Sequence, residues 1–315
     1  MKIVCLGDLH LLWDKPIGRK DDAHKVQMDK MKFVLDWALD NDAIILQPGD
    51  FFDTARSWHL TSAYSEFFGS YLYTPLYAVY GQHDTYMYSE KTRHATGLGV
   101  LIANKLIRLL NSKGYVLPGR NNAHMYIYGA SFGQEIPKPK IEKDQLNILV
   151  IHKMIVGNEK LGYWQKDGDF VYAENFLDEY KDYDLIVCGD CHRKFMFEQD
   201  GRYIVNSGPL FRKEADMYNL TEASPGFYFY NTNNKKLKWI DVPHESADKV
   251  LSRNHIERQE EIDEAMEEFV SKMKINDDEM TSVDFMSNLI SFLDSNKVED
   301  GVKDILSEVM DEELK

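Results

Sequence analysis

Short apolar runs rich in β-branched and aromatic residues recur along the chain, and each is closed by Gly, Asp or His. They are Lys2–Leu6, Ala43–Leu46, Leu76–Tyr80, Tyr126–Tyr128, Asn147–Ile151, Asp184–Cys188, Tyr203–Val205 and Gly226–Tyr230. Runs of this length and composition are typical of buried β-strands. The pattern therefore predicts a protein with at least eight strands.

Between several of these runs lie segments whose apolar residues recur at helical spacing. Ala23–Leu39 carries apolar residues at helical intervals between the first two predicted strands, which indicates a βαβ unit. Thr61–Ser70 and His94–Asn104 are further predicted helices, and strands predominate after Tyr115. This order favours an α/β fold, a two-sheet αββα sandwich with outer helices.

The pattern changes after Val242-Pro243, where three amphipathic helices are expected. Their apolar positions are Ile262, Met266, Phe269, Val270 and Met273, then Phe285, Leu289, Ile290, Phe292 and Leu293, then Val298, Val302, Ile305, Leu306, Val309 and Met310. We therefore divide the chain into an α/β domain, 1–245, and a small C-terminal helical appendage, 246–315.

Charge is distributed unevenly between these two parts. The chain carries 37 Lys and Arg against 52 Asp and Glu, a net charge of −15. Residues 246–315 hold 20 acids and 8 bases, so that 1–245 is nearly neutral at −3. This balance argues against a protein whose whole surface grips nucleic acid through unspecific charge.

Cysteine content and hydropathy bear on the compartment. Three cysteines cannot form a disulfide framework, and no stretch approaches 18 consecutive apolar residues. Met1–Leu6 runs directly into a predicted strand without a signal-peptide pattern. We expect a reduced, cytoplasmic protein without membrane attachment, or one in the host cytoplasm if the gene is viral.

Polar residues stand where the predicted strands end. The five strand ends carry Gly7-Asp8-Leu9-His10, Gly49-Asp50-Phe51-Phe52-Asp53, Gly81-Gln82-His83-Asp84, Ile151-His152 and Gly189-Asp190-Cys191-His192. A single polar residue of this kind usually caps a helix or forms a turn. Five polar strand ends in succession are better explained by one site to which all of them contribute. Carboxylate, imidazole and amide groups bind divalent metals, and ligands collect at the carboxyl ends of strands in α/β folds.

The series D-x-H, G-D-x-x-D, G-x-H-D, a lone H and G-x-x-H resembles the calcineurin-like metallophosphoesterase superfamily from residue 1 to about 210. Asn206-Ser207-Gly208-Pro209-Leu210-Phe211-Arg212 follows the last motif and Asp53-Thr54 follows the second. With these runs the chain looks closest to SbcD-type nuclease subunits of double-strand-break repair complexes, including their short phage relatives.

The resemblance implies a site with two divalent ions. Asp8, His10, Asp50 and His192 would hold the first ion, and Asp50, Gln82, His152 and Asp190 the second. Water activated between the ions would attack phosphorus. His83 would protonate the leaving oxygen or stabilise the transition state, with Asp84 holding it in place and Asp53 supporting the ligands.

Two positions depart from the family pattern, which has Asn at Gln82 and His at Asp190. Both departures fall on the second ion, so the longer amide arm and the shorter acidic side chain are expected to compensate for each other. The extra carboxylate makes this position richer in oxygen and favours Mn²⁺, or Mg²⁺, over Zn²⁺. The alternative is a second ion that binds weakly or not at all.

Other candidates near the motifs are less specific. Arg56, His59, Arg193 and Arg212 are expected to contact substrate phosphates, although each could equally be a solvated surface residue, as could Lys153, Lys194 and Lys213. Cys188 and Cys191 have C-x-x-C spacing. No second pair is present for a zinc site, and Asp190 between them is already assigned as a metal ligand, so neither zinc binding nor a redox role is favoured.

The resemblance implies a two-metal phosphodiesterase that cleaves DNA as an exonuclease or endonuclease. Its expected partners are DNA and an SbcC-type ABC ATPase with coiled coils, which would dock on the acidic helices. Because relatives often dimerise, a homodimer is also an expected state. Two alternatives remain. One is a phosphoesterase acting on a small molecule or a phosphoprotein, and the other is a weakly active scaffold for the ATPase.

Overall fold

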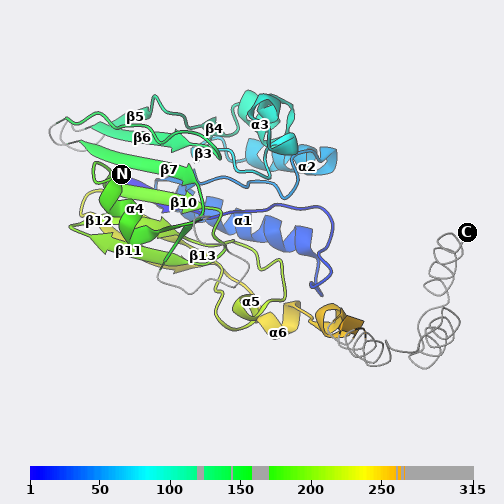
Figure 1. The fold of residues 1–315 in the computed structure, drawn as a ribbon. Coiled ribbons are helices and arrows are strands. Elements are labelled where there is room, and N and C mark those ends of the chain that lie inside the picture. The colour runs from blue at the N-terminus through cyan, green and yellow to red at the C-terminus, as the bar shows by residue number, and fades with distance from the viewer. Residues whose placement is uncertain (119–123, 143–144, 158–169, 260–261, 264–265, 267–315) are drawn as a thin grey trace, which may run out of the picture. The chain divides into compact units, whose positions relative to one another are not determined.

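The computed structural model describes residues 1–118, 124–142, 145–157, 170–259, 262, 263 and 266 (Figure 1). The chain divides into two compact units, Met1–Ser252 and Arg253–Lys315. In the second unit the described residues 254–259, 262, 263 and 266 are helical, so Ile262 and Met266 stand in the predicted first helix. The other predicted positions of the three C-terminal helices lie outside the described residues. The part of the chain that the structure describes contains no helix long and apolar enough to cross a membrane.

The first sheet carries the N-terminal strands. Its order is β14 (Lys236–Asp241), β13 (Gly226–Asn231), β1 (Lys2–Cys5), β2 (Ala43–Gln47), β3 (Leu76–Ala78) and β4 (Arg108–Leu109). Strands β1 to β4 are parallel, with Val4 opposite Ile45 and Ile45 opposite Leu76. The ends of β1, β2 and β3 therefore lie at one edge of this sheet.

The second sheet supplies the remaining strand ends. Its order is β11 (Phe195–Gln199), β12 (Arg202–Asn206), β10 (Leu185–Gly189), β7 (Leu146–His152), β6 (His124–Ala130) and β5 (Tyr115–Pro118). β10 and β7 are parallel neighbours, with Gly189 opposite His152. A two-stranded sheet pairs β8 (Ile155–Val156) with β9 (Val171–Tyr172).

Helices cover the outer face of each large sheet. The helices α1 (Ala23–Asp40), α2 (Trp58–Gly69) and α3 (Gly97–Ala103) pack on the first sheet, and α4 (Ala173–Glu179) packs on the second (Figure 1). Alternation along β1 shows the layers: Ile3 and Cys5 point into the core between the sheets, whereas Val4 points toward the helices. The predicted αββα sandwich is confirmed.

Local sequence explains why α1 and α2 begin where they do. The side chain of Asp22 accepts a hydrogen bond from Lys25 N, and the side chain of Ser57 accepts one from Leu60 N. Both are N-caps. Helix α1 then buries Met31, Val34 and Leu35 against the first sheet.

All eight predicted strands and the three predicted N-terminal helices are present, with shifted ends. Further elements were not predicted. They are the strands β4, β5, β8, β9, β11 and β14, the helices α4, α5 (Met217–Thr221) and α6 (Ala247–Val250), and the 3₁₀ turns η1 (Tyr86–Tyr88) and η2 (Glu90–Ala95). β5, β11 and β14 are edge strands of the two large sheets and have exposed residues, so none shows the continuous apolar pattern of a buried strand.

Candidate metal centre

The ligand residues sit on sharp turns directly after strands. His10, Asp50 and Asp190 adopt left-handed backbone conformations, with φ of 42°, 50° and 75°. Such φ values cost energy in residues other than glycine and are tolerated where the surrounding structure fixes them. The turns aim these side chains back over the strand ends instead of along the strands.

Two glycines allow the turns to approach one another. A Cβ on Gly81 would overlap the carboxylate of Asp50, and a Cβ on Gly189 would overlap Oδ1 of Asp8. Both glycines therefore leave space that the acidic side chains occupy. This explains the Gly that precedes each of the motifs at Gln82 and Asp190.

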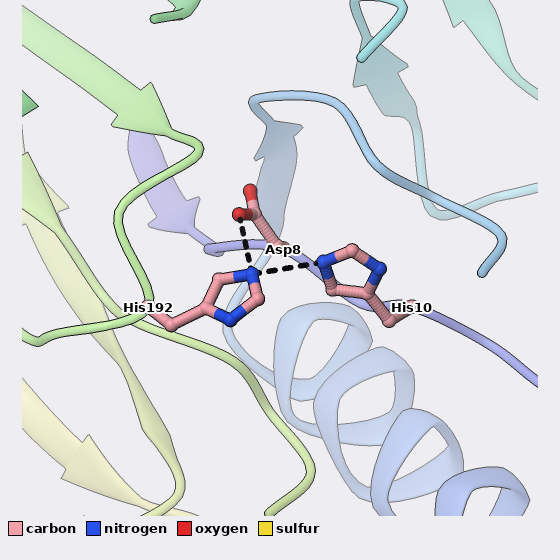
Figure 2. A group of neighbouring side chains, drawn as sticks. All are labelled: Asp8, His10 and His192. Atoms are coloured by element: carbon pink, nitrogen blue, oxygen red, sulfur yellow. Dashed lines mark hydrogen bonds and ion pairs between the residues drawn. The ribbon is translucent and has the colours of Figure 1, made fainter. Parts of the chain in front are cut away.

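The first predicted ligand group converges from the two sheets. Nε2 of His10 lies 3.0 Å from Nε2 of His192, and the latter lies 3.7 Å from Oδ2 of Asp8 (Figure 2). Nε2 of His10 also lies 3.7 Å from Oδ2 of Asp50. Asp8, His10 and His192 can thus turn ligand atoms toward a common point, as can His10, Asp50 and His83.

The second predicted ligand group is also assembled. Nε2 of His152 lies 2.5 Å from Oε1 of Gln82 and 3.5 Å from Oδ2 of Asp50. Nε2 of Gln82 donates a hydrogen bond of 2.8 Å to Oδ1 of Asp190. The two residues that depart from the family pattern are therefore in direct contact.

Hydrogen bonding indicates that a cation fits this second group. Nδ1 of His152 lies 2.8 Å from the carbonyl oxygen of Pro48, so the proton of the neutral ring belongs on Nδ1. The lone pair on Nε2 then faces the oxygens of Gln82 and Asp50, and a divalent cation bound among these atoms would remove their mutual repulsion.

Electrostatics lead to the same conclusion for the first group. Burial, together with repulsion from Asp8, raises the pKa of Asp50 to about 10, and burial raises that of Asp8 well above its usual value. Burial also lowers the pKa of His10 and His152 to about 4. Oδ1 of Asp8 has no hydrogen-bond partner among the described residues. Clustered buried carboxylates with neutral imidazoles form a site that divalent cations would stabilise.

His83 stands beside the ligands without belonging to either predicted set. Its ring is 4.9 Å from that of His10, and its backbone N–H donates to Oδ1 of Asp50. Nδ1 of His83 lies 2.9 Å from the carbonyl oxygen of Asp53. The ring is half-buried and borders the open cavity.

The predicted role of Asp84 was wrong in one respect. Its carboxylate accepts hydrogen bonds from the backbone N–H groups of Gly81, Phe51 and Phe52, so it joins two motif turns instead of holding the ring of His83. Burial raises the pKa of Asp84 to about 6. The carbonyl of Asp53 fixes the imidazole, a contact that residue types alone could not reveal.

Asp53 supports the ligands through its side chain as well. Its Oδ1 lies 3.3 Å from Nδ1 of His10 and 2.5 Å from Nζ of Lys213. Although burial opposes it, these two contacts hold the pKa of Asp53 below its usual range. A carboxylate on Nδ1 leaves Nε2 of His10 as the free ligand atom.

A cavity of about 570 Å³ opens over both groups. Its lining includes His10, Asp50, Gln82, His83, Asp190 and His192, whereas Asp8 and His152 are buried beneath. The opposite wall comes from residues 209–219, including α5. Glu214, Asp216 and Tyr218 in this wall were not predicted, because no motif continues past Arg212.

The predicted substrate residues have different outcomes. Arg193 lines the cavity, with its guanidinium carbon 5.2 Å from the ring centre of Tyr218. Arg56 is exposed and lies over Tyr86, and His59 is exposed and stacks on Trp13, so neither lines the cavity. The placement of Arg212 was wrong. Its side chain is buried on the far side of the chain segment and donates to the carbonyl of Glu245.

The solved structures that match this chain share little sequence with it. TT1561 of Thermus thermophilus is 14% identical with a TM-score of 0.44, over 77% of this chain and 99% of that one. A putative 5′-nucleotidase from Staphylococcus aureus in complex with alpha-ketoglutarate is 10% identical with a TM-score of 0.44, over 78% of this chain and 55% of that one. Vps29 of Chaetomium thermophilum is 15% identical with a TM-score of 0.33, over 77% and 100%. This chain thus spans about half the length of the nucleotidase.

A search of curated proteins finds no relative of this chain. The sequence model described as calcineurin-like phosphoesterase, in contrast, matches residues 1–194, which is more than half of the chain. This match covers every residue of the two ligand groups. The chain therefore belongs to the calcineurin-like phosphoesterase family, whose members are dinuclear metal-dependent hydrolases.

Proposed function

We propose that this protein is a metal-dependent phosphodiesterase that cleaves DNA, as SbcD-type nucleases do. The observation that carries the proposal is the position of His83 beside the two ligand groups. A phosphodiester releases an alkoxide, which is a poor leaving group until it gains a proton. An imidazole at the cavity wall supplies that proton.

The contacts of His83 suit this role. The carbonyl oxygen of Asp53 accepts from Nδ1, which leaves Nε2 as the atom that gives or takes a proton at the cavity. The backbone hydrogen bond from His83 to Asp50 ties the ring's position to the ligand cluster. The acid is therefore held at a fixed place relative to the ligands.

Other groups of this chain could bind and orient a phosphate. Arg193 and Lys213 line the cavity and offer N–H donors to phosphoryl oxygens. The first ion would be held by Asp8, His10, Asp50 and His192, and the second by Asp50, Gln82, His152 and Asp190. Divalent ions in such a site lower the pKa of water and neutralise charge on the phosphoryl oxygens.

The second ligand group supports Mn²⁺ or Mg²⁺ as the cofactor. The amide of Gln82 and the carboxylates of Asp50 and Asp190 are oxygen ligands, and His152 adds a single nitrogen. Oxygen-rich sites suit these ions better than they suit Zn²⁺. Mn²⁺, which accepts both oxygen and imidazole ligands, is the metal we propose.

The proposed partner is an ABC ATPase with coiled coils, docked through residues 246–315. The support is the charge of this region, net −12, which disfavours direct contact with DNA and suits a basic protein surface. Its expected amphipathic helices would present apolar faces for docking.

One observation favours a smaller substrate. Glu214 and Asp216 line the cavity wall opposite the ligands, and acidic side chains there repel an extended polyanion. The volume of about 570 Å³ suits a small ligand. A phosphoesterase for small molecules is therefore the second candidate.

The deciding experiment compares substrates. End-labelled single- and double-stranded DNA, bis-p-nitrophenyl phosphate and p-nitrophenyl phosphate would be incubated with the full chain in Mn²⁺, Mg²⁺ or EDTA. We expect metal-dependent cleavage of DNA and the diester, abolished by Asp50→Ala and strongly reduced by His83→Ala. His94→Ala, which changes an exposed histidine remote from the motifs, is the matched control.

Each outcome has a definite meaning. Hydrolysis of the monoester alone would overturn the nuclease proposal, and hydrolysis of small diesters without DNA would favour the second candidate. Absence of hydrolysis would be followed by adding an ATPase partner. Continued inactivity would leave the scaffold as the better description.

A further inference from the structure

A short segment, Pro209–Lys213, separates the metal centre from a second pocket. We call this segment the strap. Pro209, Phe211 and Lys213 line the cavity over the ligands. Arg212, in contrast, lines a different pocket of about 600 Å³ on the opposite side of the strap.

Three cations are buried at this second pocket. Arg19, Lys30 and Arg212 have only 4%, 5% and 5% of their surface exposed, and all three line it. Lys30 donates to the carbonyl of Leu210 at 2.9 Å, and Arg19 donates to the carbonyl of Arg212 at 3.0 Å. Arg19 and Lys30 also face the ring of Phe211.

Two of these cations lack an acidic partner. Arg19 is paired with Asp21 at 2.6 Å. Within the described part of the chain, Lys30 and Arg212 contact only carbonyl oxygens and the Phe211 ring, and Nε of Arg212 has no hydrogen-bond partner. Burial and the neighbouring arginines lower the pKa of Lys30 to about 7. Burying like charges side by side is costly unless a counter-charge joins them.

The acids around the pocket supply only part of that counter-charge. Burial lowers the pKa of both Lys30 and Arg212, and the carboxylate of Asp21 acts to raise it, but Asp21 is itself paired with Arg19, and the other acids pair with exposed lysines. The pairs are Asp21 with Arg19, Asp29 with Lys25, Asp36 with Lys32, and Glu245 with Lys249. One carboxylate, that of Asp21, therefore faces three buried cations, Arg19, Lys30 and Arg212. The missing group is therefore an anion that enters the pocket.

We propose that this pocket binds the phosphate group of a small phosphorylated molecule, with Arg212 and Lys30 as its ligands. A guanidinium and an ammonium are the usual protein ligands of a phosphate dianion. Phe33, Val26 and Pro243 form apolar walls of the same pocket and can cover the rest of the molecule. The volume is that of a site for a nucleotide-sized ligand.

The strap gives this site a route to the metal centre. Leu210 and Arg212 carry contacts on the basic side, Phe211 borders both sides, and Lys213 faces the cavity, where it binds Asp53. A phosphate that holds Arg212 therefore also fixes the strap whose other side shapes the cavity. The proposal does not rest on the cleavage of DNA.

The test measures binding by isothermal titration to the full chain, both in EDTA and loaded with Mg²⁺. The probes are inorganic phosphate, deoxyadenosine 5′-monophosphate and a twelve-nucleotide DNA without terminal phosphates. In EDTA the metal centre has no divalent ion to hold a phosphate, so binding under this condition reports on the second pocket. We expect phosphate and the mononucleotide to bind, with affinity about tenfold or more lower in Arg212→Gln and in Lys30→Met.

Lys32→Gln is the matched control, because Lys32 lines the same pocket but is exposed and paired with Asp36. It should keep the wild-type affinity. Tighter binding of the mononucleotide than of phosphate would assign the apolar walls to the nucleoside, and equal binding would assign the site to phosphate alone. Binding of the twelve-nucleotide DNA alone would overturn the proposal.

A second measurement needs no substitution. Acetic anhydride labels accessible uncharged amines, and mass spectrometry of peptides reports the labelling of each lysine. Phosphate at saturating concentration should protect Lys30 several-fold and leave Lys32 unchanged. Equal labelling of Lys30 with and without phosphate, or unchanged affinity in both variants, would overturn the proposal.

Discussion

The metal centre and the basic pocket lie on opposite sides of one strap and bury opposite charges. At the metal centre the pKa of Asp50 is raised to about 10 by burial and by its acidic neighbour. At the basic pocket the pKa of Lys30 is lowered to about 7 by burial and by neighbouring arginines. In both places a buried charge lacks its counter-charge within the described residues, and in both the missing partner is best explained as a ligand.

The two regions differ in how they hold their charges. At the metal centre, ligands leave strand ends through left-handed turns, so several acids approach one point. At the basic pocket, Lys30 projects from the middle of α1, and Arg212 comes from the strap. The first arrangement fixes many ligand atoms for small ions, and the second presents two cations to a larger anion.

The largest expected effect is a loss of catalytic rate without a loss of metal binding. His83→Ala should lower kcat for a phosphodiester by about 10²–10⁴-fold, because the leaving oxygen loses its proton donor. Metal affinity should change little, since His83 lies in neither predicted ligand set. Steady-state kinetics and Mn²⁺ titration would be compared for His83→Ala and the control His94→Ala. Equal loss in both variants would remove His83 from the chemistry.

Without metal, the free energy of unfolding should depend on pH through the buried carboxyl groups. Asp8 and Asp50 have folded pKa values above their unfolded values, so the folded state holds protons that the unfolded state releases above about pH 4. In EDTA the contribution of these two acids to the free energy of unfolding should therefore fall as pH rises from about 4 toward 10. Saturating Mn²⁺ should restore about 3–4 kcal/mol at neutral pH.

Thermal unfolding at pH 5 and pH 8, with and without Mn²⁺, checks this prediction. Asp50→Asn should flatten the pH dependence in EDTA and reduce the stabilisation by metal. If stability in EDTA rises between pH 5 and pH 8, the acids are not the dominant buried charge.

The basic pocket should show the opposite slope. Lys30 has a folded pKa of about 7, below its unfolded value, so the unfolded state binds more protons between about pH 7 and pH 10.5. Its contribution to stability should increase by about 3 kcal/mol between pH 7 and pH 9.5. Chemical denaturation of wild type and Lys30→Met at pH 7 and pH 9.5 isolates the contribution. Parallel changes in both proteins would contradict it.

The smallest expected effect concerns the contact between Gln82 and Asp190. Asp190→His removes the acceptor of the 2.8 Å hydrogen bond and should weaken metal binding, whereas Gln82→Asn with Asp190→His should restore it. We expect a coupling energy of about 1–2 kcal/mol in Mn²⁺ affinity, as is usual for residues in contact. A double-mutant cycle measured by titration gives this value. Four equal affinities would contradict compensation.

Several parts of the fold could be predicted because they are local. Apolar runs specify buried strands, and Ala23–Leu39 specifies α1 through its helical periodicity. Edge strands such as β14 escaped prediction because only contact with β13 makes Lys236–Asp241 a strand. Two features of the site could not be predicted for the same reason: the role of Asp84 and the side of the strap on which Arg212 lies. Backbone amides and carbonyls distant in sequence determine both.

The sequence by itself determined the fold class and the order of the five polar strand ends, because strand periodicity and Gly-Asp turns are encoded within a few residues. Tertiary structure decided which of those groups face each other. It placed Gln82 against Asp190, separated by 108 positions, and aligned Lys30 with Leu210, separated by 180. Residues so far apart meet only through the packing of two sheets and their helices. The burial that shifts the pKa values of Asp50 and Lys30 in opposite directions arises from the same packing.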